Sequence, residues 1–151
     1  MQRGPKSSGT AAAYQPRWYI NPSFEAMQQK TILVVEDDKD HLTIAAALLR
    51  YYGYVVLEAM NANDGIKLAI NQLPDLILMD LQLPEMNGIE ALKVLRSDPR
   101  TREIPAVPYT SFYDLYREQL ANLGFTAHIP KTFTPGSLQR AVVELIGEPN
   151  S

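Results

Sequence analysis

The sequence predicts an α/β fold in which a doubly wound, five-stranded parallel sheet is covered by five helices. Short apolar segments alternate with segments of helical periodicity over about 120 residues, a pattern typical of βα units joined by right-handed crossovers. Two of the apolar segments, at residues 32–35 and 76–79, are uninterrupted, as expected of strands that are buried on both faces. These observations favour a parallel sheet between two layers of helices.

Five strands are expected, each at a short apolar run. The first (32–35) and the third (76–79) are the continuous runs, and the third ends at Asp80. Pro108 falls inside the fourth strand, and because proline donates no backbone hydrogen bond, we predict a bulge just before Thr110. The remaining strands are shorter and are expected at residues 54–57, 106–109 and 127–129.

Helices are predicted from apolar residues that recur three and four positions apart. The first contains such a series at residues 42–49 and is closed by Gly53, a residue suited to the position after a helix. The second has the same spacing at residues 66–73 and is stopped by Pro74. Further helices are expected at residues 88–96 and 114–122, and a last one carries its apolar face on Leu138, Ala141, Val142 and Leu145.

Length and composition suit one globular domain. The chain has 151 residues, of which 46% are hydrophobic and 21% are charged, enough to build one core. We expect this domain at residues 30–147, between a disordered tail at residues 1–29 and a short C-terminal tail at residues 148–151. The N-terminal tail also has an alternative interpretation as a docking segment, because it holds four possible aromatic anchors, Tyr14, Trp18, Tyr19 and Phe24.

Composition disfavours several classes of protein. No apolar run approaches the roughly 18 residues of a membrane span, and no apolar stretch follows the basic N-terminal residues as in a secretory signal. The absence of cysteine suits a cytoplasmic protein. Residues 1–30 carry a net charge of +3 and the other 121 residues carry −6, so the domain lacks the positive face that nucleic-acid phosphates require. We therefore expect no membrane and no direct nucleic-acid partner.

Polar residues follow four of the expected strands. Glu36 and Asp37 follow the first strand, Asp80 the third and Thr110 the fourth, and Lys131 comes just after the fifth. In a doubly wound sheet the carboxyl ends of the strands form one rim, where ligands bind. Carboxylates without a nearby histidine or cysteine favour a hard cation such as Mg²⁺. A carboxylate beside Mg²⁺ and a lysine ammonium is suited to attack phosphorus.

Each of these clusters has a simpler interpretation when taken alone. Acidic residues after a strand often cap the helix that follows, and Asp38 or Asp40 suits that role. The placement of all four clusters after strands is what favours a shared functional site.

These residues resemble the receiver domain of response regulators, the CheY-like switches of two-component signalling. The similarity covers about residues 30–147, and the most specific segment is residues 74–88, in which Asp80, Pro84 and Gly88 have the family's spacing. The other matching segments are residues 32–38, Thr110 and residues 130–131. Asp80 also lies at separations that suit the family, 43 residues after Asp37, 30 before Thr110 and 51 before Lys131. The resemblance implies a flavodoxin-like fold with strand order 2-1-3-4-5.

The resemblance implies a role for each matching residue of the pocket. Asp80 is similar to the phosphoacceptor of the family. Asp37 resembles the direct ligand of the Mg²⁺ cofactor, Glu36 the second acid, which acts mainly through water, and Gln82 the residue that gives its backbone carbonyl to the metal. Lys131 is expected to pair with a phosphoryl oxygen.

The resemblance also implies how a switch would work and which partners it would have. Thr110 is expected to hydrogen-bond another phosphoryl oxygen, and its movement lets an aromatic residue turn inward; that position is His128 here. The movement alters a face formed by the fourth helix (114–122), the fifth strand (127–129) and the last helix, where a downstream protein binds. The phosphoryl donor is a histidine kinase or a phosphotransfer protein. We expect no enzyme activity beyond the protein's own phosphorylation and dephosphorylation.

Three departures from the family's pattern fall on the switching side. Thr132 stands after Lys131 where the family usually has a proline in a cis bond, so we expect a trans or reshaped loop. Pro108 interrupts the fourth strand. His128 is either a partly exposed residue with no role or a switch residue whose burial is disfavoured when it is protonated.

Two other functions remain as alternatives. The departures on the switching side favour a pseudo-receiver, a binding module that is not phosphorylated, although the pocket residues are all present. A Mg²⁺-dependent phosphatase with an aspartyl nucleophile is the other alternative. It is disfavoured because such enzymes need an acid two residues after the nucleophile, and this chain has Gln82 there.

Overall fold

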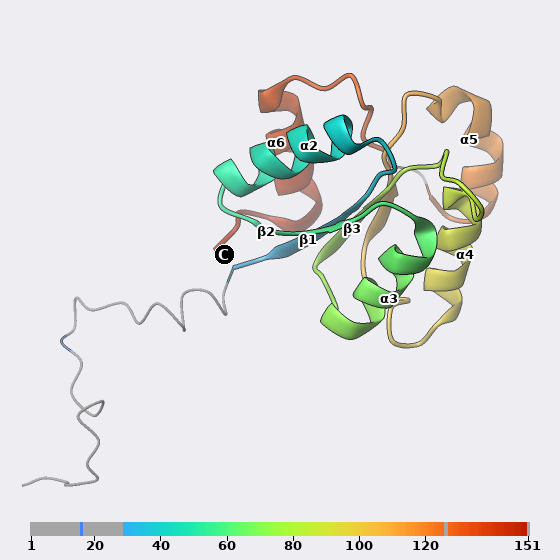
Figure 1. The fold of residues 1–151 in the computed structure, drawn as a ribbon, viewed down its shortest axis with the longest axis horizontal. Coiled ribbons are helices and arrows are strands. Elements are labelled where there is room, and N and C mark those ends of the chain that lie inside the picture. Colours follow the sequence, from blue (N-terminus) through green and yellow to red (C-terminus); the bar gives the residue numbers. More distant parts are fainter. Residues whose placement is uncertain (1–15, 17–28, 126, 151) are drawn as a thin grey trace, which may run out of the picture.

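The computed structural model describes residue 16, residues 29–125 and residues 127–150. The predicted N-terminal tail lies outside the described residues, apart from positions 16 and 29. The described residues form four parallel strands in the order β2-β1-β3-β4, and helices cover both faces of the sheet (Figure 1). The strands are β1 (Thr31–Val35), β2 (Val55–Ala59), β3 (Leu76–Met79) and β4 (Ala106–Pro108).

Five helices are formed by the described residues. None of them is both long and apolar enough to cross a membrane. They agree with the predicted segments to within a few residues at each end, and their bounds are α2 (Lys39–Tyr51), α3 (Ala62–Gln72), α4 (Gly88–Ser97), α5 (Tyr113–Asn122) and α6 (Pro135–Ile146). The doubly wound, flavodoxin-like α/β fold is confirmed.

The sheet separates two apolar cores. Ile32 and Val34 of β1 pack with α2 and α6 on one face, whereas Leu33 and Val35 pack with α3, α4 and α5 on the other. All four side chains are fully buried, as the continuous apolar run predicted. The sheet is thereby held rigidly between two helical layers, and its carboxyl rim becomes a fixed platform for the polar residues that follow the strands.

The start of α2 is fixed by Asp38. Its side chain accepts hydrogen bonds from the backbone N–H groups of Asp40 and His41, both at 3.0 Å, which makes Asp38 the N-cap. The cap sets the course of the short loop that carries Glu36 and Asp37 out of β1. At the other end of α2, Gly53 has φ of 108° and closes the helix as predicted.

Within the described residues, the predicted fifth strand is reduced to one bridge between Tyr109 and Ile129. The N–H of Ile129 donates to the carbonyl of Pro108, and the N–H of Thr110 donates to the carbonyl of Ile129. One step earlier in a parallel ladder, residue 108 would donate to the carbonyl of Ala127, but proline has no N–H. Pairing therefore stops there. The predicted bulge is absent, since β4 stays in register with β3.

Candidate functional site

Three carboxylates meet at the carboxyl rim of the sheet. Glu36 follows β1, Asp37 is the next residue, and Asp80 follows β3; ligand oxygens of the three side chains all lie within 4.8 Å of one another. Glu36 is fully buried and Asp80 is 2% exposed, whereas Asp37 faces solvent. The sequence prediction that these acids share one pocket is borne out by this geometry.

The position of Asp80 is fixed by backbone contacts on both sides. Its N–H donates to the carbonyl of Val35 at 3.0 Å, which ties the end of β3 to the end of β1. Its side-chain Oδ1 accepts the N–H of Gln82 at 3.0 Å. Gly88 at the start of α4 lies so close that a Cβ there would be 2.0 Å from the Asp80 carbonyl oxygen, so only glycine fits this position.

Lys131 reaches into the same pocket. Its Nζ is 3.0 Å from Oδ2 of Asp80 and 2.7 Å from Oε1 of Glu36, and its side chain is 16% exposed. The ammonium also lies over the ring of Tyr109, with Nζ 5.5 Å from the ring centroid. No peptide bond between described residues is cis. The Lys131 ammonium therefore reaches Asp80 and Glu36 although the bond between Lys131 and Thr132 is trans.

Burial sets the charge state of the pocket. It raises the pKa of Asp80 to about 6, against the lowering effects of the Gln82 N–H and Lys131. Burial also disfavours the charged form of Lys131, but its contacts with Glu36 and Asp80 outweigh that effect and the pKa of the ammonium lies above its usual value. Two buried acids thus share one cation, which leaves the pocket with an excess of negative charge.

This donor set suits a divalent cation. Glu36, Asp37 and Asp80 supply carboxylate oxygens, the ligands that hard cations prefer. Oε1 of Glu36 is buried, and among the described residues its near charge partner is the Lys131 ammonium at 2.7 Å, which Asp80 shares. A second cation in the pocket would relieve this excess of negative charge. One residue was overlooked in the sequence: Nδ1 of His41 lies 3.9 Å from Glu36 Oε1, at the mouth of the pocket.

Thr110 and His128, which were predicted to act as the switch, lie beside the pocket and form no hydrogen bond or ion pair with its three acids in the described part of the chain. Thr110 is 2% exposed, and its Oγ1 accepts the N–H of Phe112 at 2.9 Å. His128 is partly buried and stacks on Tyr113 of α5, with ring centroids 3.8 Å apart and planes 7° from parallel. A cavity of about 270 Å³ lies between these groups and is lined by Thr110, His128, Tyr113 and five further residues.

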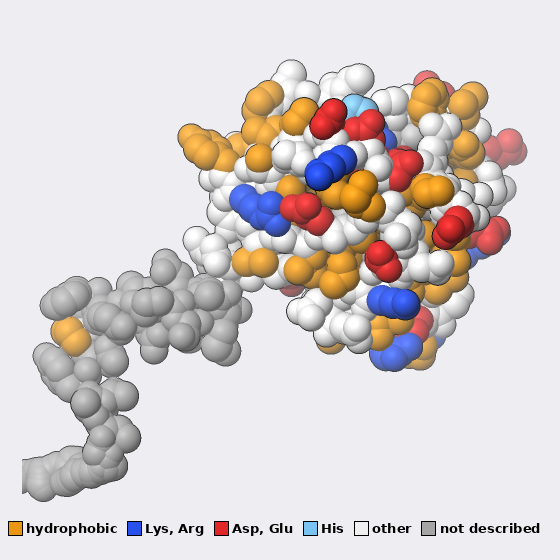
Figure 2. Space-filling view, in the orientation of Figure 1, with side chains coloured by type: hydrophobic (Ala, Val, Ile, Leu, Met, Phe, Trp, Pro, Cys, Tyr) orange, Lys and Arg blue, Asp and Glu red, His pale blue; other side chains and the backbone are white. Residues whose placement is uncertain are grey.

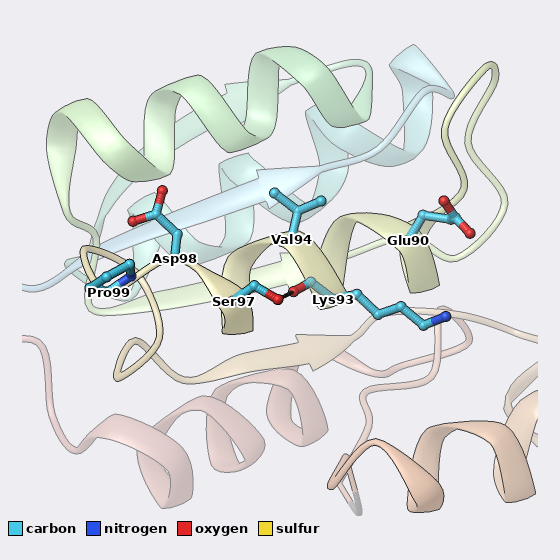
Figure 3. A pocket seen from close by; sticks show the side chains of 6 residues that line it. All are labelled: Glu90, Lys93, Val94, Ser97, Asp98 and Pro99. Atoms are coloured by element: carbon cyan, nitrogen blue, oxygen red, sulfur yellow. Dashed lines mark hydrogen bonds between the residues drawn. The ribbon is translucent and has the colours of Figure 1, made fainter.

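A larger hollow lies elsewhere on the surface. It has a volume of about 660 Å³ and runs along α4, where Glu90, Lys93, Val94, Ser97, Asp98 and Pro99 line it (Figure 3). None of the three clustered carboxylates lines this hollow. Its polar groups include Asp98, whose pKa is lowered to about 2 by its pairing with Arg100. We assign the functional site to the acidic pocket because charge, burial and convergent side chains coincide there.

A family model for the response regulator receiver domain matches residues 32–143. The chain belongs to the response-regulator receiver family. Among curated relatives, the polar-differentiation response regulator DivK of Brucella anthropi is 31% identical over 120 residues, which are 79% of this chain and 98% of the relative. DivK of Brucella ovis is 30% identical over the same shares.

Solved structures of receiver domains have the same fold. The receiver domain of the sensor histidine kinase PA1611 from Pseudomonas aeruginosa is 30% identical, with a TM-score of 0.73 over 80% of this chain and 99% of that one; it was determined with a magnesium ion coordinated in its active site cleft. The chemotaxis protein CheY4 of Vibrio cholerae is 22% identical, with a TM-score of 0.72 over 78% of this chain and 98% of that one. The second likeness bears on the fold alone.

Membership of the family places the receiver domain in two-component signalling. Response regulators are signalling proteins that interact with kinases or phosphotransfer proteins and with downstream partners. The acidic cluster, together with the magnesium-bound relative, supports binding of a divalent cation in the pocket.

Proposed function

We propose that this receiver domain accepts a phosphoryl group on Asp80 with the help of Mg²⁺ and signals by contact with a downstream protein. The donor is the phosphohistidine of a histidine kinase or of a phosphotransfer protein. The observation that carries the proposal is the pairing of Asp80: one carboxylate oxygen is held by a backbone N–H, and the other faces a lysine ammonium, beside two further carboxylates.

The chemistry requires a carboxylate oxygen of Asp80 to attack the phosphorus. A new O–P bond forms as the N–P bond of the phosphohistidine breaks, and the imidazole of the donor leaves with the electron pair and takes up a proton. Transfer of this kind needs cations where charge builds up on the equatorial oxygens. Lys131 is 3.0 Å from Asp80 and suits that role. Mg²⁺, when bound, supplies the second cation, and Glu36, Asp37, Asp80 and the backbone carbonyl of Gln82 would hold it.

The proposed response to phosphorylation runs through Thr110 and His128. The Thr110 hydroxyl would donate to a phosphoryl oxygen, and its movement toward that oxygen would weaken the hydrogen bond that its Oγ1 now accepts from the N–H of Phe112. The cavity between Thr110 and His128 gives the loop room to move. Release of His128 from its stack on Tyr113 would change the surface of α5 and α6, which is the face we propose for the downstream protein.

The alternatives have weaker support. Gln82 is the second residue after Asp80 and its side chain supplies no proton to a leaving group, which disfavours a phosphatase. The pseudo-receiver is disfavoured because the Lys131 ammonium donates to Asp80. It does so although Thr132, and not the family's usual proline, follows Lys131. Both alternatives predict that no stable phosphoryl group accumulates on Asp80.

Incubation of the protein with acetyl phosphate and Mg²⁺ tests the proposal. We expect a base-labile acyl phosphate in the wild type and none in Asp80→Asn. Asp114→Asn is the matched control, because its carboxylate is exposed at the start of α5, and it should label like the wild type. Equal labelling of Asp80→Asn, or none in the wild type with acetyl phosphate or with a phosphohistidine donor, would contradict the proposal.

A further inference from the structure

Lys131 lies in a loop that the backbone holds only loosely. The ladder between β4 and the segment before Lys131 is a single bridge, because Pro108 lacks the N–H that would extend it. Pro130 and Thr132 flank Lys131, and Pro130 has no N–H to donate. A flexible lysine side chain has about 2 kcal/mol of rotamer entropy to lose when it is fixed, so a contact that restricts the side chain would add to the ion pairs with Asp80 and Glu36 in holding the ammonium.

Tyr109 contacts this loop at three points. Its backbone pairs with Ile129, two residues before Lys131. Its ring lies under the ammonium of Lys131, with Nζ 5.5 Å from the centroid. On the other side of the loop, the ring packs against Phe133 at 6.4 Å between centroids. Tyr109 is 1% exposed and belongs to the core beneath β4, so it is a rigid platform.

The chemistry of the ring suits this task. The face of a tyrosine ring attracts a cation through its quadrupole, and the attraction grows when water is excluded. The ring carries no formal charge, so it does not neutralise the ammonium as another carboxylate would. The pKa of Tyr109 is raised above its usual value by burial and by the charges of Glu36 and Asp80, which keeps the phenol neutral. The ammonium can therefore shift from Asp80 to an incoming phosphoryl oxygen while it stays over the ring.

We propose that Tyr109 is a positioning residue that aims Lys131 at the phosphoryl group, with Phe133 as its brace. The role rests on the proposed phosphorylation of Asp80. Tyr109 itself does not touch the transferring group; it acts through Lys131. In this chain the buried ring of Tyr109 helps to orient Lys131. The backbone before Lys131 pairs with β4 through a single bridge and restricts the loop less.

Variants at position 109 separate the ring from the hydroxyl. Tyr109→Phe keeps the ring and should be phosphorylated by acetyl phosphate within about twofold of the wild-type rate. Tyr109→Leu removes the ring and should be slower by about tenfold, the size of a partly desolvated cation–π contact. Val142→Ala, a truncation in the same core on α6, is the control for general loosening and should keep the wild-type rate. Phe133→Leu should give a smaller slowing, and it takes over the test if Tyr109→Leu does not fold.

A double-mutant cycle distinguishes positioning from a structural role. If Tyr109 acts through Lys131, Tyr109→Leu should slow phosphorylation about tenfold in the wild-type background and have almost no further effect in Lys131→Ala. Equal slowing in both backgrounds, or a Tyr109→Phe variant as slow as Tyr109→Leu, would overturn the proposal.

An NMR measurement on the unphosphorylated protein does not depend on the proposed function. In protein with ¹³C-labelled lysine, the Hε protons of Lys131 should be shifted upfield by the ring current of Tyr109. The shift should persist in Tyr109→Phe and disappear in Tyr109→Leu. If the wild type is not phosphorylated but the ring-current shift is present, the proposed function fails and the contact stands. If the shift is absent, the positioning role fails.

Discussion

At the scale of single residues, burial of the ionised Asp80 carboxylate destabilises the fold. This carboxylate is 2% exposed, and burial is the main cause that raises its pKa from 3.8 to about 6. Lys131 compensates the charge only in part, because Glu36 uses the same ammonium. A buried acid that is destabilised in its ionised form is typical of a site that awaits a cation or a substrate.

The pH dependence of Asp80→Asn tests this conclusion. Between pH 3.8 and about 6 the folded protein holds a proton on Asp80 that the unfolded chain has lost, so wild-type stability falls as the pH rises through this window. Without metal, Asp80→Asn should have the same free energy of unfolding as the wild type below this pH window. Above the window its free energy of unfolding should be higher by about 2–3 kcal/mol. Urea unfolding at several pH values measures the difference. Asp114→Asn should show no such change, and a constant difference for Asp80→Asn at all pH values would contradict the assignment.

The glycine at the start of α4 gives a second prediction at this scale. A methyl group at position 88 would lie 2.0 Å from the backbone carbonyl oxygen of Asp80, and backbone cannot move aside as a side chain can. Gly88→Ala should therefore destabilise the protein by about 3 kcal/mol or more. Gly136→Ala is the control, because a methyl group there meets only the flexible end of Arg140; it should be neutral or stabilising. Equal effects of the two variants on the urea midpoint would refute this reading of Gly88.

At the scale of elements, the weak point of the sheet is the edge beside β4. The even-numbered residues of this strand direct their backbone N–H and C=O groups toward the segment at 127–129. Pro108 is one of these residues. A cavity of about 170 Å³ lies at this seam and is lined by Ala106, Ala127 and neighbouring residues. The interrupted ladder and this gap in packing both lie on the amino-terminal side of the bridge between Tyr109 and Ile129.

Pro108→Val should extend the hydrogen-bonded ladder between β4 and the segment at 127–129. The new N–H can donate to the carbonyl of Ala127, and we expect a gain of about 1 kcal/mol from the added hydrogen bond. Hydrogen exchange should show new protection at the amides of residues 108 and 127. Val107→Ile, on the strand but on the side that faces α2 and α6, should leave exchange at these amides unchanged. If residue 108 gains no protection, another feature terminates the ladder.

At the scale of the whole molecule, surface charge and site agree. Acidic side chains are scattered over the face of the domain seen in Figure 2, with hydrophobic and basic groups between them. The domain part of the sequence carries −6, which favours cations over nucleic acid. The acids of the pocket come from the ends of β1 and β3, so binding of one cation bridges two neighbouring strands.

Divalent cation binding should therefore stabilise the fold. A ligand that binds only the folded state raises the free energy of unfolding by about 2.7 kcal/mol at one hundred times its dissociation constant. We expect Mg²⁺ to raise the melting temperature of the wild type and to have little effect on Asp80→Asn or Asp37→Asn. Glu90→Gln, on the outer face of α4 beside the hollow of Figure 3, should respond like the wild type. The same shift in all variants would place the ion elsewhere.

Much of this organisation could be predicted from the sequence. Glu36, Asp37, Asp80 and Lys131 could be grouped because topology alone brings strand ends to one rim. The role of Tyr109 could not be predicted, since a tyrosine in a buried strand has the pattern of an ordinary core residue.

Contacts between elements were the part that the sequence could not supply. The stack of His128 on Tyr113 joins elements whose spacing depends on packing. The effect of Pro108 depended on which edge its nitrogen faces, which only the register of β4 determines.

The most direct test of the central claim is to locate the phosphoryl group chemically. Borohydride reduces an acyl phosphate of aspartate to homoserine, which peptide mass analysis can assign to a position. After treatment with acetyl phosphate, we predict homoserine at position 80 only, dependent on Mg²⁺ and strongly reduced in Lys131→Ala. Modification at another residue, or none at Asp80 in folded protein with Mg²⁺ present, would contradict the account.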